Sequence, residues 1–266
     1  MKIRDITGLP ITSYDIIGDI AIVYIPDQYI DRSVDIAKAI MQVHKRIRSV
    51  FRKNPVEGEY RVRKLELIYG DPNTETITRE NGIVLKLDVD RVFYSPRMSN
   101  DRLIISKSVR EGENVFVPFA GIGPYAILIA KRCQTCRVVG VEKNHVAVEY
   151  FRENVNINRV KNVEVLEGDV LDFVDLYPNW ADRVIMPLPK DSYAYLRELC
   201  KVGKDRAIFH VYLFVNSSDP MNDGRTKIEQ NIDYRFEILS MRRLRGYSKS
   251  IDEYVFDIQI YKKLLS

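Results

Sequence analysis

The stretch Val115–Pro124 reads VFVPFAGIGP and decides the fold. Its apolar first half is typical of a buried strand, and Gly121 and Gly123 allow a tight turn with positive φ. Pro124 suits the first position of a helix, because its missing N–H would have no helical partner there. We expect free N–H groups and the helix dipole at this strand–turn–helix unit to favour an anionic ligand group.

Short apolar runs recur around this turn, mostly with helical segments between them. They are Asn114–Val117, Val138–Val141, Val163–Leu166, Arg183–Met186 and Ala207–Leu213. Strands that alternate with helices predict a parallel α/β sheet. Two later runs, Phe236–Leu239 and Tyr254–Tyr261, are separated by a turn and predict an antiparallel pair that closes the sheet. This pattern is typical of a class I (Rossmann-like) methyltransferase domain.

The first hundred residues predict a smaller α+β domain. Tyr14–Pro26 is typical of two strands around a Gly-Asp turn, and Asn81-Gly82 of a hairpin turn. Residues 31–51 carry apolar side chains at helical spacing, and basic residues between 38 and 52 predict a basic outer face. We therefore expect an N-terminal α+β domain over residues 1–105 and a class I domain that binds a cofactor over residues 106–266.

Composition limits the class of protein. The chain has 266 residues, of which 45% are apolar, and a net charge of +4. This charge permits a nucleic-acid partner without requiring one. No apolar stretch is long enough to span a membrane, and the first ten residues lack the apolar core of a signal peptide. We expect a cytoplasmic protein with no membrane partner.

Cys133 and Cys136 form a C-x-x-C sequence. A zinc site would need a second ligand pair, and the sequence has no second CxxC and no HxxxH. We therefore expect no metal, and we interpret the two cysteines as a surface thiol pair or a disulfide.

Acidic residues follow the next two predicted strands. Glu142 lies about 20 residues past the glycine turn, where a carboxylate suits a ribose diol. Asp169 can accept from an adenine amino group, and the alternative is a turn or cap carboxylate. Ala126 fills the third glycine position of a dinucleotide motif, which weighs against a nicotinamide cofactor. The order glycine turn, Glu, Asp predicts S-adenosyl-L-methionine as the cofactor.

Residues 11–262 resemble the archaeal and eukaryotic tRNA (guanine-N1)-methyltransferase family, whose relatives include aminocarboxypropyl transferases of wybutosine synthesis. The resemblance rests on DIIGDIAIVYIP (15–26), GEYRVRKLELIYGD (58–71), TRENGIVLKLDVDRVFYSPR (78–97), PFAGIGP (118–124) and VIMPLPK (184–190). It implies methylation of guanosine 37 at N1, with the tRNA anticodon stem-loop as partner. We expect the enzyme to be a monomer. The family often carries a further N-terminal domain, and we expect this chain to be a form without it.

The resemblance also implies RNA-facing and catalytic segments in the N-terminal domain, and it implies individual catalytic residues. Arg61 matches an arginine at the target guanine, and Asp101 matches a glutamate that is the proposed base. Pro187 replaces an asparagine, although its carbonyl and the Leu188 N–H remain. Asp101 is one methylene shorter than the glutamate it replaces. The residues expected at the cofactor are Arg102, Phe119, Ala120, Gly121, Gly123, Pro124, Glu142, Lys143, Asp169, Val170 and Pro187.

Several activities stay open. Ser95-Pro96-Arg97 and Gly123-Pro124 favour the methyltransferase branch of the family. A wybutosine-pathway enzyme would act on the same nucleotide, by C-methylation of the tricyclic guanine derivative or by aminocarboxypropyl transfer. An RNA-binding protein that binds the donor without catalysis is a further alternative. So is a small-molecule methyltransferase, because the fold alone does not fix the substrate.

Overall fold

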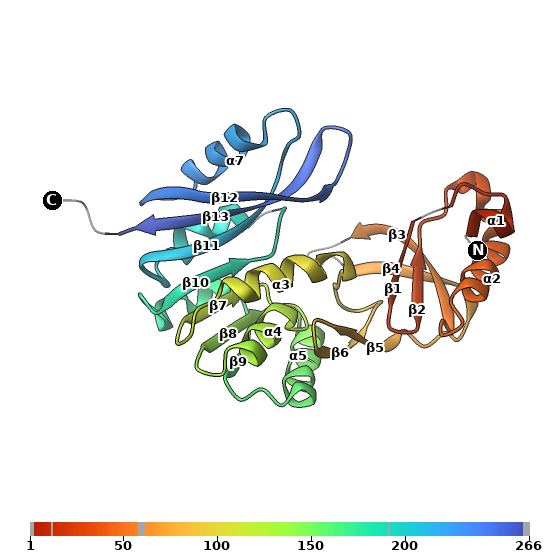
Figure 1. The fold of residues 1–266 in the computed structure, drawn as a ribbon, viewed down its shortest axis with the longest axis horizontal. Coiled ribbons are helices and arrows are strands. Elements are labelled where there is room, and N and C mark those ends of the chain that lie inside the picture. The colour runs from red at the N-terminus through yellow and green to blue at the C-terminus, as the bar shows by residue number, and fades with distance from the viewer. Residues whose placement is uncertain (1–2, 12, 58–61, 191, 263–266) are drawn as a thin grey trace.

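The computed structural model describes residues 3–11, 13–57, 62–190 and 192–262. A smaller N-terminal unit and a larger unit around a seven-stranded sheet lie at opposite ends of the molecule, with a two-stranded hairpin between them (Figure 1). Within the described ranges, no helix is long and apolar enough to cross a membrane.

The large sheet has the strand order β12-β13-β11-β10-β7-β8-β9. The pairings β10–β11, β10–β7, β7–β8 and β8–β9 are parallel, whereas β13 runs antiparallel to both β11 and β12. The predicted parallel sheet with an antiparallel closing pair is therefore confirmed. Its strands are β7 (Asn114–Pro118), β8 (Arg137–Glu142), β9 (Val163–Glu167), β10 (Ala181–Met186), β11 (Gly203–Asn216), β12 (Arg235–Gly246) and β13 (Ile251–Tyr261).

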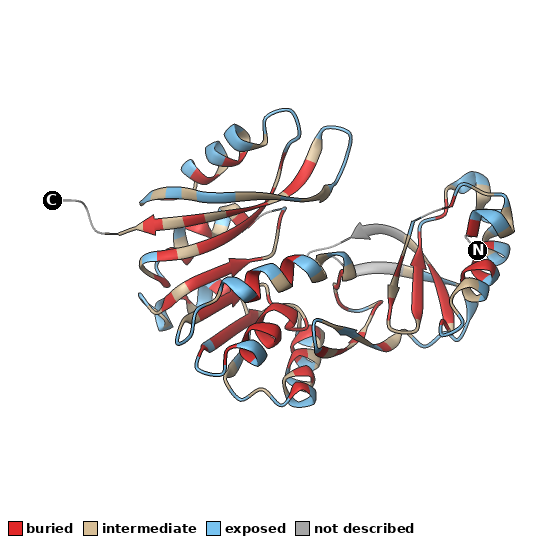
Figure 2. Cartoon of the chain, viewed as in Figure 1, coloured by how far each residue is buried: buried red, intermediate tan, exposed pale blue. Residues whose placement is uncertain are grey.

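Helices cover both faces of this sheet, so its central strands are buried (Figure 2). Side chains alternate along β7: Val115 and Val117 pack in the core beneath α4, and Phe116 packs in the core on the other face. The helices are α3 (Ser99–Ser108), α4 (Pro124–Arg132), α5 (His145–Asn158), α6 (Leu196–Leu199) and α7 (Pro220–Glu229), with short 3-10 turns η2 (Pro96–Met98), η3 (Val170–Leu176) and η4 (Ser192–Tyr195).

The N-terminal unit is a four-stranded sheet with the order β1-β2-β3-β4 and its own core. The two strands predicted around Gly18 are confirmed, since β1 and β2 pair antiparallel across that turn. The elements are α1 (Ile3–Thr7), β1 (Tyr14–Ile17), β2 (Ile20–Val23), η1 (Asp27–Arg32), α2 (Ser33–Val43), β3 (Ser49–Glu57) and β4 (Val62–Gly70).

The predicted basic helix is shorter than its apolar pattern indicated. Helix α2 ends at Val43, and β3 pairs parallel with β2 a few residues later. Ile40 is buried on the helix and Val50 is buried on the strand. The apolar residues that follow one helical spacing in the sequence therefore belong to two different elements.

Two of the basic residues that follow the helix, Arg48 and Arg52, are engaged in ion pairs. Arg48 donates from Nε to Asp19 at 2.8 Å and from Nη1 to Asp71 at 2.7 Å. The prediction of one continuous basic helix face over residues 38–52 is therefore wrong.

The hairpin of β5 (Glu75–Glu80) and β6 (Ile83–Asp88) confirms the predicted turn, since Asn81 and Gly82 have φ values of 47° and 82°. Two asparagines one helical turn apart on α5 form hydrogen bonds with the backbone of this hairpin. Asn154 accepts from the Lys86 N–H at 2.7 Å and donates to its carbonyl at 3.0 Å, and Asn158 binds Val84 in the same way. Residues 75–88 are thus attached to a helix of the large unit. The predicted domain boundary at residue 105 stays a prediction.

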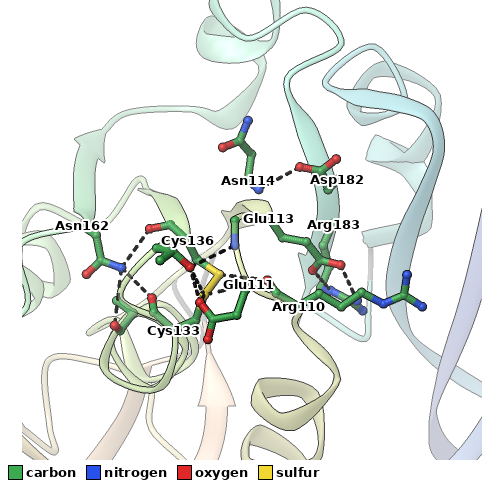
Figure 3. The surroundings of a disulfide bond; sticks show 12 residues. Arg110, Glu111, Glu113, Asn114, Cys133, Cys136, Asn162, Asp182 and Arg183 are labelled. Atoms are coloured by element: carbon green, nitrogen blue, oxygen red, sulfur yellow. Dashed lines mark hydrogen bonds and ion pairs between the residues drawn. A yellow bond between two sulfur atoms is a disulfide. The ribbon is translucent and has the colours of Figure 1, made fainter.

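A disulfide joins Cys133 and Cys136, between the end of α4 and the start of β8 (Figure 3). The disulfide interpretation is confirmed, but the surface placement is wrong, because these residues are only 5% and 1% exposed. The Asn162 side chain donates to both cysteine carbonyls at 2.9 Å. The disulfide lies at the amino edge of the sheet, opposite the glycine turn that follows β7.

We predict that Asn154→Ala lowers the free energy of unfolding by about 1–3 kcal/mol, because it removes the side-chain partner of the half-buried backbone groups of Lys86 and of the buried Ile122 carbonyl. Urea denaturation measures this change. Asn156→Ala, on the exposed face of the same helix, is the matched control. Equal losses in the two variants would contradict the structural role of Asn154.

Candidate active site

Two adjoining cavities open where the parallel strands end. They share the walls Phe93, Phe119, Gly121 and Pro187. We call the cavity beside Glu142 the donor cavity, because it contains the residues expected at the cofactor ribose and adenine. Its other lining residues are Val141, Glu142, Lys143, Asn144, Ala147, Gly168, Asp169, Val170, Leu188 and Tyr195. The acceptor cavity is completed by Tyr94, Ser95, Met98, Arg102, Ala120, Ile122, Pro124, Tyr125, Pro189, Arg245 and Glu253.

The Glu142 carboxylate organises the donor cavity. It accepts from the backbone N–H of Gly121 at 2.7 Å, of Lys143 at 2.9 Å and of Asn144 at 2.8 Å. Burial raises the pKa of Glu142, and the three N–H donors lower the pKa by less. Glu142 therefore fixes the glycine turn and also faces the cavity, as expected for a ribose acceptor.

The turn after β7 is left-handed at three residues. Phe119, Gly121 and Gly123 have φ values of 57°, 57° and 85°. Phe119 is a bulky residue in a region that favours glycine, and its ring packs edge-on against Tyr195 at 5.0 Å. Gly123 lines neither cavity, because it faces Phe151: a Cβ there would lie 2.0 Å from that ring. Gly123 therefore serves packing and the start of α4 rather than direct contact with a ligand.

Asp169 combines two interpretations that the sequence left as alternatives. It caps η3, since Oδ1 accepts from the Leu171 N–H at 3.1 Å, and it also lines the donor cavity. Its Oδ2 lies 3.4 Å from Lys143 Nζ. Lys143 and Val170 line the same cavity, as predicted.

Arg102, Ala120 and Pro124, expected at the cofactor, line the acceptor cavity rather than the donor cavity. Arg102 is buried and donates to both oxygens of Glu80, at 2.5 and 2.6 Å. Its guanidinium also lies 5.2 Å from the centre of the Tyr94 ring. Arg102 thus holds one wall of the acceptor cavity through an ion pair.

Asp101 lies behind the acceptor cavity and lines neither hollow. It is 4% exposed, and it accepts from Tyr125 at 2.8 Å, from the Tyr212 hydroxyl and from Arg242 Nη2 at 2.7 Å. The Tyr125 side chain separates Asp101 from the cavity, and burial raises the pKa of this phenol well above its usual value. The role of Asp101 as a base therefore stays a prediction.

A chain of buried charged groups continues from Asp101 across the sheet. Arg183 Nη1 donates to His210 Nε2 at 2.7 Å, and His210 Nδ1 lies 2.6 Å from Asp257. Because an arginine only donates, His210 is the neutral tautomer with its proton on Nδ1, and burial lowers its pKa accordingly. The remaining links are Arg242–Asp257 at 3.4 Å and Arg183–Glu113 at 2.8 Å.

The other two predicted catalytic positions differ in outcome. Pro187 lines both cavities, as expected for a residue between donor and acceptor. The Leu188 N–H, expected to be available to a ligand, donates instead to the Met186 carbonyl at 2.9 Å. Arg61 lies outside the described residues.

Sequence reasoning gave no role to Arg245 and Glu253, which come from the last two strands. They face each other across β12 and β13. Strand alternation could have placed Glu253 on an inward face, but no local motif marks it.

A seven-stranded sheet of this order, with a glycine turn and an acidic strand end around a cavity, defines a class I methyltransferase. Residues 76–238 match the TRM5/TYW2 methyltransferase domain, and residues 5–74 match the TYW2 N-terminal domain. The chain belongs to the TRM5/TYW2 methyltransferase family.

Relatives include the tRNA (guanine(37)-N(1))-methyltransferase Trm5b of Pyrococcus abyssi, which is 39% identical over 89% of this chain and 71% of the relative. Its crystal structure superposes with a TM-score of 0.88 at 36% identity, covering 98% of this chain and 81% of that one. The complex of aTrm5 with tRNALeu has a TM-score of 0.85 at 27% identity, covering 98% and 78%. The tRNA (guanine(37)-N(1))/4-demethylwyosine(37)-methyltransferase Taw22 of Nanoarchaeum equitans is 31% identical over 94% of this chain and 96% of the relative.

We predict that Glu142→Ala weakens binding of S-adenosylmethionine by about 1–3 kcal/mol, because a ribose diol loses its acceptor and the Gly121 N–H loses its partner. Calorimetry measures the affinity. Glu167→Ala is the control, because this residue ends the neighbouring strand β9 and lines neither cavity. Unchanged affinity in Glu142→Ala would refute the assignment of Glu142 to the donor.

Proposed function

We propose that the protein methylates N1 of guanosine 37 in tRNA, with S-adenosyl-L-methionine as the methyl donor. It acts as a monomer in the cytoplasm and engages the anticodon stem-loop. The observation that carries this proposal is the pair of cavities that meet at Phe119, Gly121 and Pro187, since a donor and a base need adjoining sites for direct transfer. The printed names of the P. abyssi relative and of the tRNA complex support the choice of substrate.

The residues of the donor cavity fit an adenosine-containing cofactor. Glu142 offers a carboxylate to the ribose hydroxyls, and Asp169 is an acceptor at the end of the next strand. Gly121 leaves open space at the turn, since a Cβ there would meet no atom closer than 3.8 Å. When bound, S-adenosylmethionine supplies an activated methyl group.

The target base must leave its stack to enter the acceptor cavity, where Tyr94 and Tyr125 provide aromatic walls. Guanine N1 carries a proton that has to be removed. We propose that this proton moves to the Tyr125 oxygen while the phenolic proton of Tyr125 moves to Asp101, 2.8 Å away. Arg242 holds the Asp101 carboxylate in place for this transfer.

Nucleoside mass spectrometry tests the function directly. An unmodified transcript with guanosine at position 37, incubated with enzyme and donor, is expected to yield N1-methylguanosine, and a transcript with adenosine there is expected to yield none. Methylation at another atom or nucleotide would refute the proposal.

Methylation of the tricyclic derivative is the second candidate, because the N. equitans relative carries both activities in its name and matches over nearly its whole length. A tRNA that already carries the tricyclic base, assayed in parallel, distinguishes the two. The mass of the product also separates methyl transfer from aminocarboxypropyl transfer.

We predict that Asp101→Asn slows the single-turnover rate about 10²-fold while donor and tRNA affinities are retained, because basicity is lost and shape is kept. Asp101→Glu should slow it too, since an extra methylene in a buried site shifts the carboxylate relative to its three hydrogen-bond partners. Asp175→Asn, at an exposed carboxylate, is the control. An unchanged rate in Asp101→Asn would eliminate Asp101 as the proton acceptor.

A further inference from the structure

One ion pair in the wall of the acceptor cavity joins the last two strands of the sheet. Arg245 Nε lies 2.5 Å from Glu253 Oε2, and Glu253 is only 2% exposed. The two residues are opposite each other in the antiparallel register of β12 and β13. Both line the acceptor cavity and neither lines the donor cavity, so any ligand of this pair lies on the acceptor side.

A neighbouring pair on the same two strands shows what a purely structural contact looks like. Arg243 binds both oxygens of Asp252, with two hydrogen bonds of 2.9 Å, and neither residue lines a cavity. Asp252 and Glu253 are successive residues of a strand and point to opposite faces. Arg245 binds Glu253 through Oε2, and since a carboxylate offers about four lone-pair sites, Glu253 can accept further hydrogen bonds from a ligand.

The rest of the wall favours a flat ligand whose polar edge meets this carboxylate. Tyr94, Tyr125, Pro124 and Pro189 supply flat, largely apolar surfaces. A buried carboxylate oxygen with spare acceptor capacity favours a ligand that brings a hydrogen-bond donor into the cavity. On its Watson–Crick edge guanine offers the 2-amino group beside N1, whereas a tricyclic derivative has this edge closed by the third ring.

We propose that Glu253 accepts a hydrogen bond from the 2-amino group of the target guanine and that Arg245 holds Glu253 in position for it. This contact orients N1 toward the donor cavity without occupying N1. It selects unmodified guanine over a base that lacks a free 2-amino group. The inference rests on the proposed function and names the substrate class of the same site.

The test removes, in turn, the 2-amino group of the base and the carboxylate of Glu253. Transcripts with guanosine 37 or inosine 37, which lacks only the 2-amino group, are assayed with wild-type enzyme, Glu253→Gln and Asp252→Asn. In the glutamine variant Arg245 binds the amide oxygen, which leaves an amide N–H₂ facing the base. We expect wild-type kcat/KM to fall about 10-fold or more from guanosine to inosine, and Glu253→Gln to lose about as much on guanosine.

The preference of each variant for guanosine 37 over inosine 37 tests the role of Glu253. Glu253→Gln is expected to treat the two transcripts nearly alike, whereas Asp252→Asn keeps the wild-type preference. Donor affinity by calorimetry should match wild type in both variants, because neither residue lines the donor cavity. Equal wild-type rates on the two transcripts, or an undiminished preference in Glu253→Gln, would overturn the Glu253 assignment alone. No methylated nucleoside from wild type on any transcript would overturn the proposed function with it.

Discussion

The hydrogen bond from the Gly121 N–H to the Glu142 carboxylate is the constraint on which the site depends. It ties the turn after β7 to the end of β8, two strands that pair in parallel along their whole length. Because the same carboxylate accepts from two further backbone N–H groups, the turn cannot move without breaking a half-buried network of charge-assisted hydrogen bonds. The left-handed conformation of Phe119 is held in this way, and it forms the wall between the two cavities.

The acceptor side is built by different means. The two arginines in its wall are each paired with a carboxylate: Arg102 with Glu80, and Arg245 with Glu253. Such pairs resist displacement, since removing either partner leaves a buried charge. The donor side thus relies on backbone N–H groups and the acceptor side on side-chain pairs. A change of substrate can therefore occur on the acceptor side without altering cofactor binding.

Local signals in the sequence carried much of the fold. The glycine turn and the Asn81-Gly82 hairpin depend on neighbours only a few residues away, and each was predictable. The end of α2 was not, because the apolar spacing of the helix ran on into β3 and only pairing with β2 separates the two. The surroundings of Asp101 were equally hidden, since Tyr212 and Arg242 are 111 and 141 residues away in the chain. The place of Glu253 in the cavity wall could not be predicted either, because it depends on the register of β12 against β13.

The chain of charged groups behind Asp101 also makes the stability of the site depend on temperature. Two arginines, three carboxylates and a neutral histidine share these contacts, and most of these side chains are buried or nearly so. Burying ions costs hydration free energy, and that cost falls on heating because the hydration of charged groups becomes less favourable. Apolar packing gains little over the same range. The groups that hold Asp101 therefore contribute relatively more to the stability of the site when the protein is hot than when it is cold.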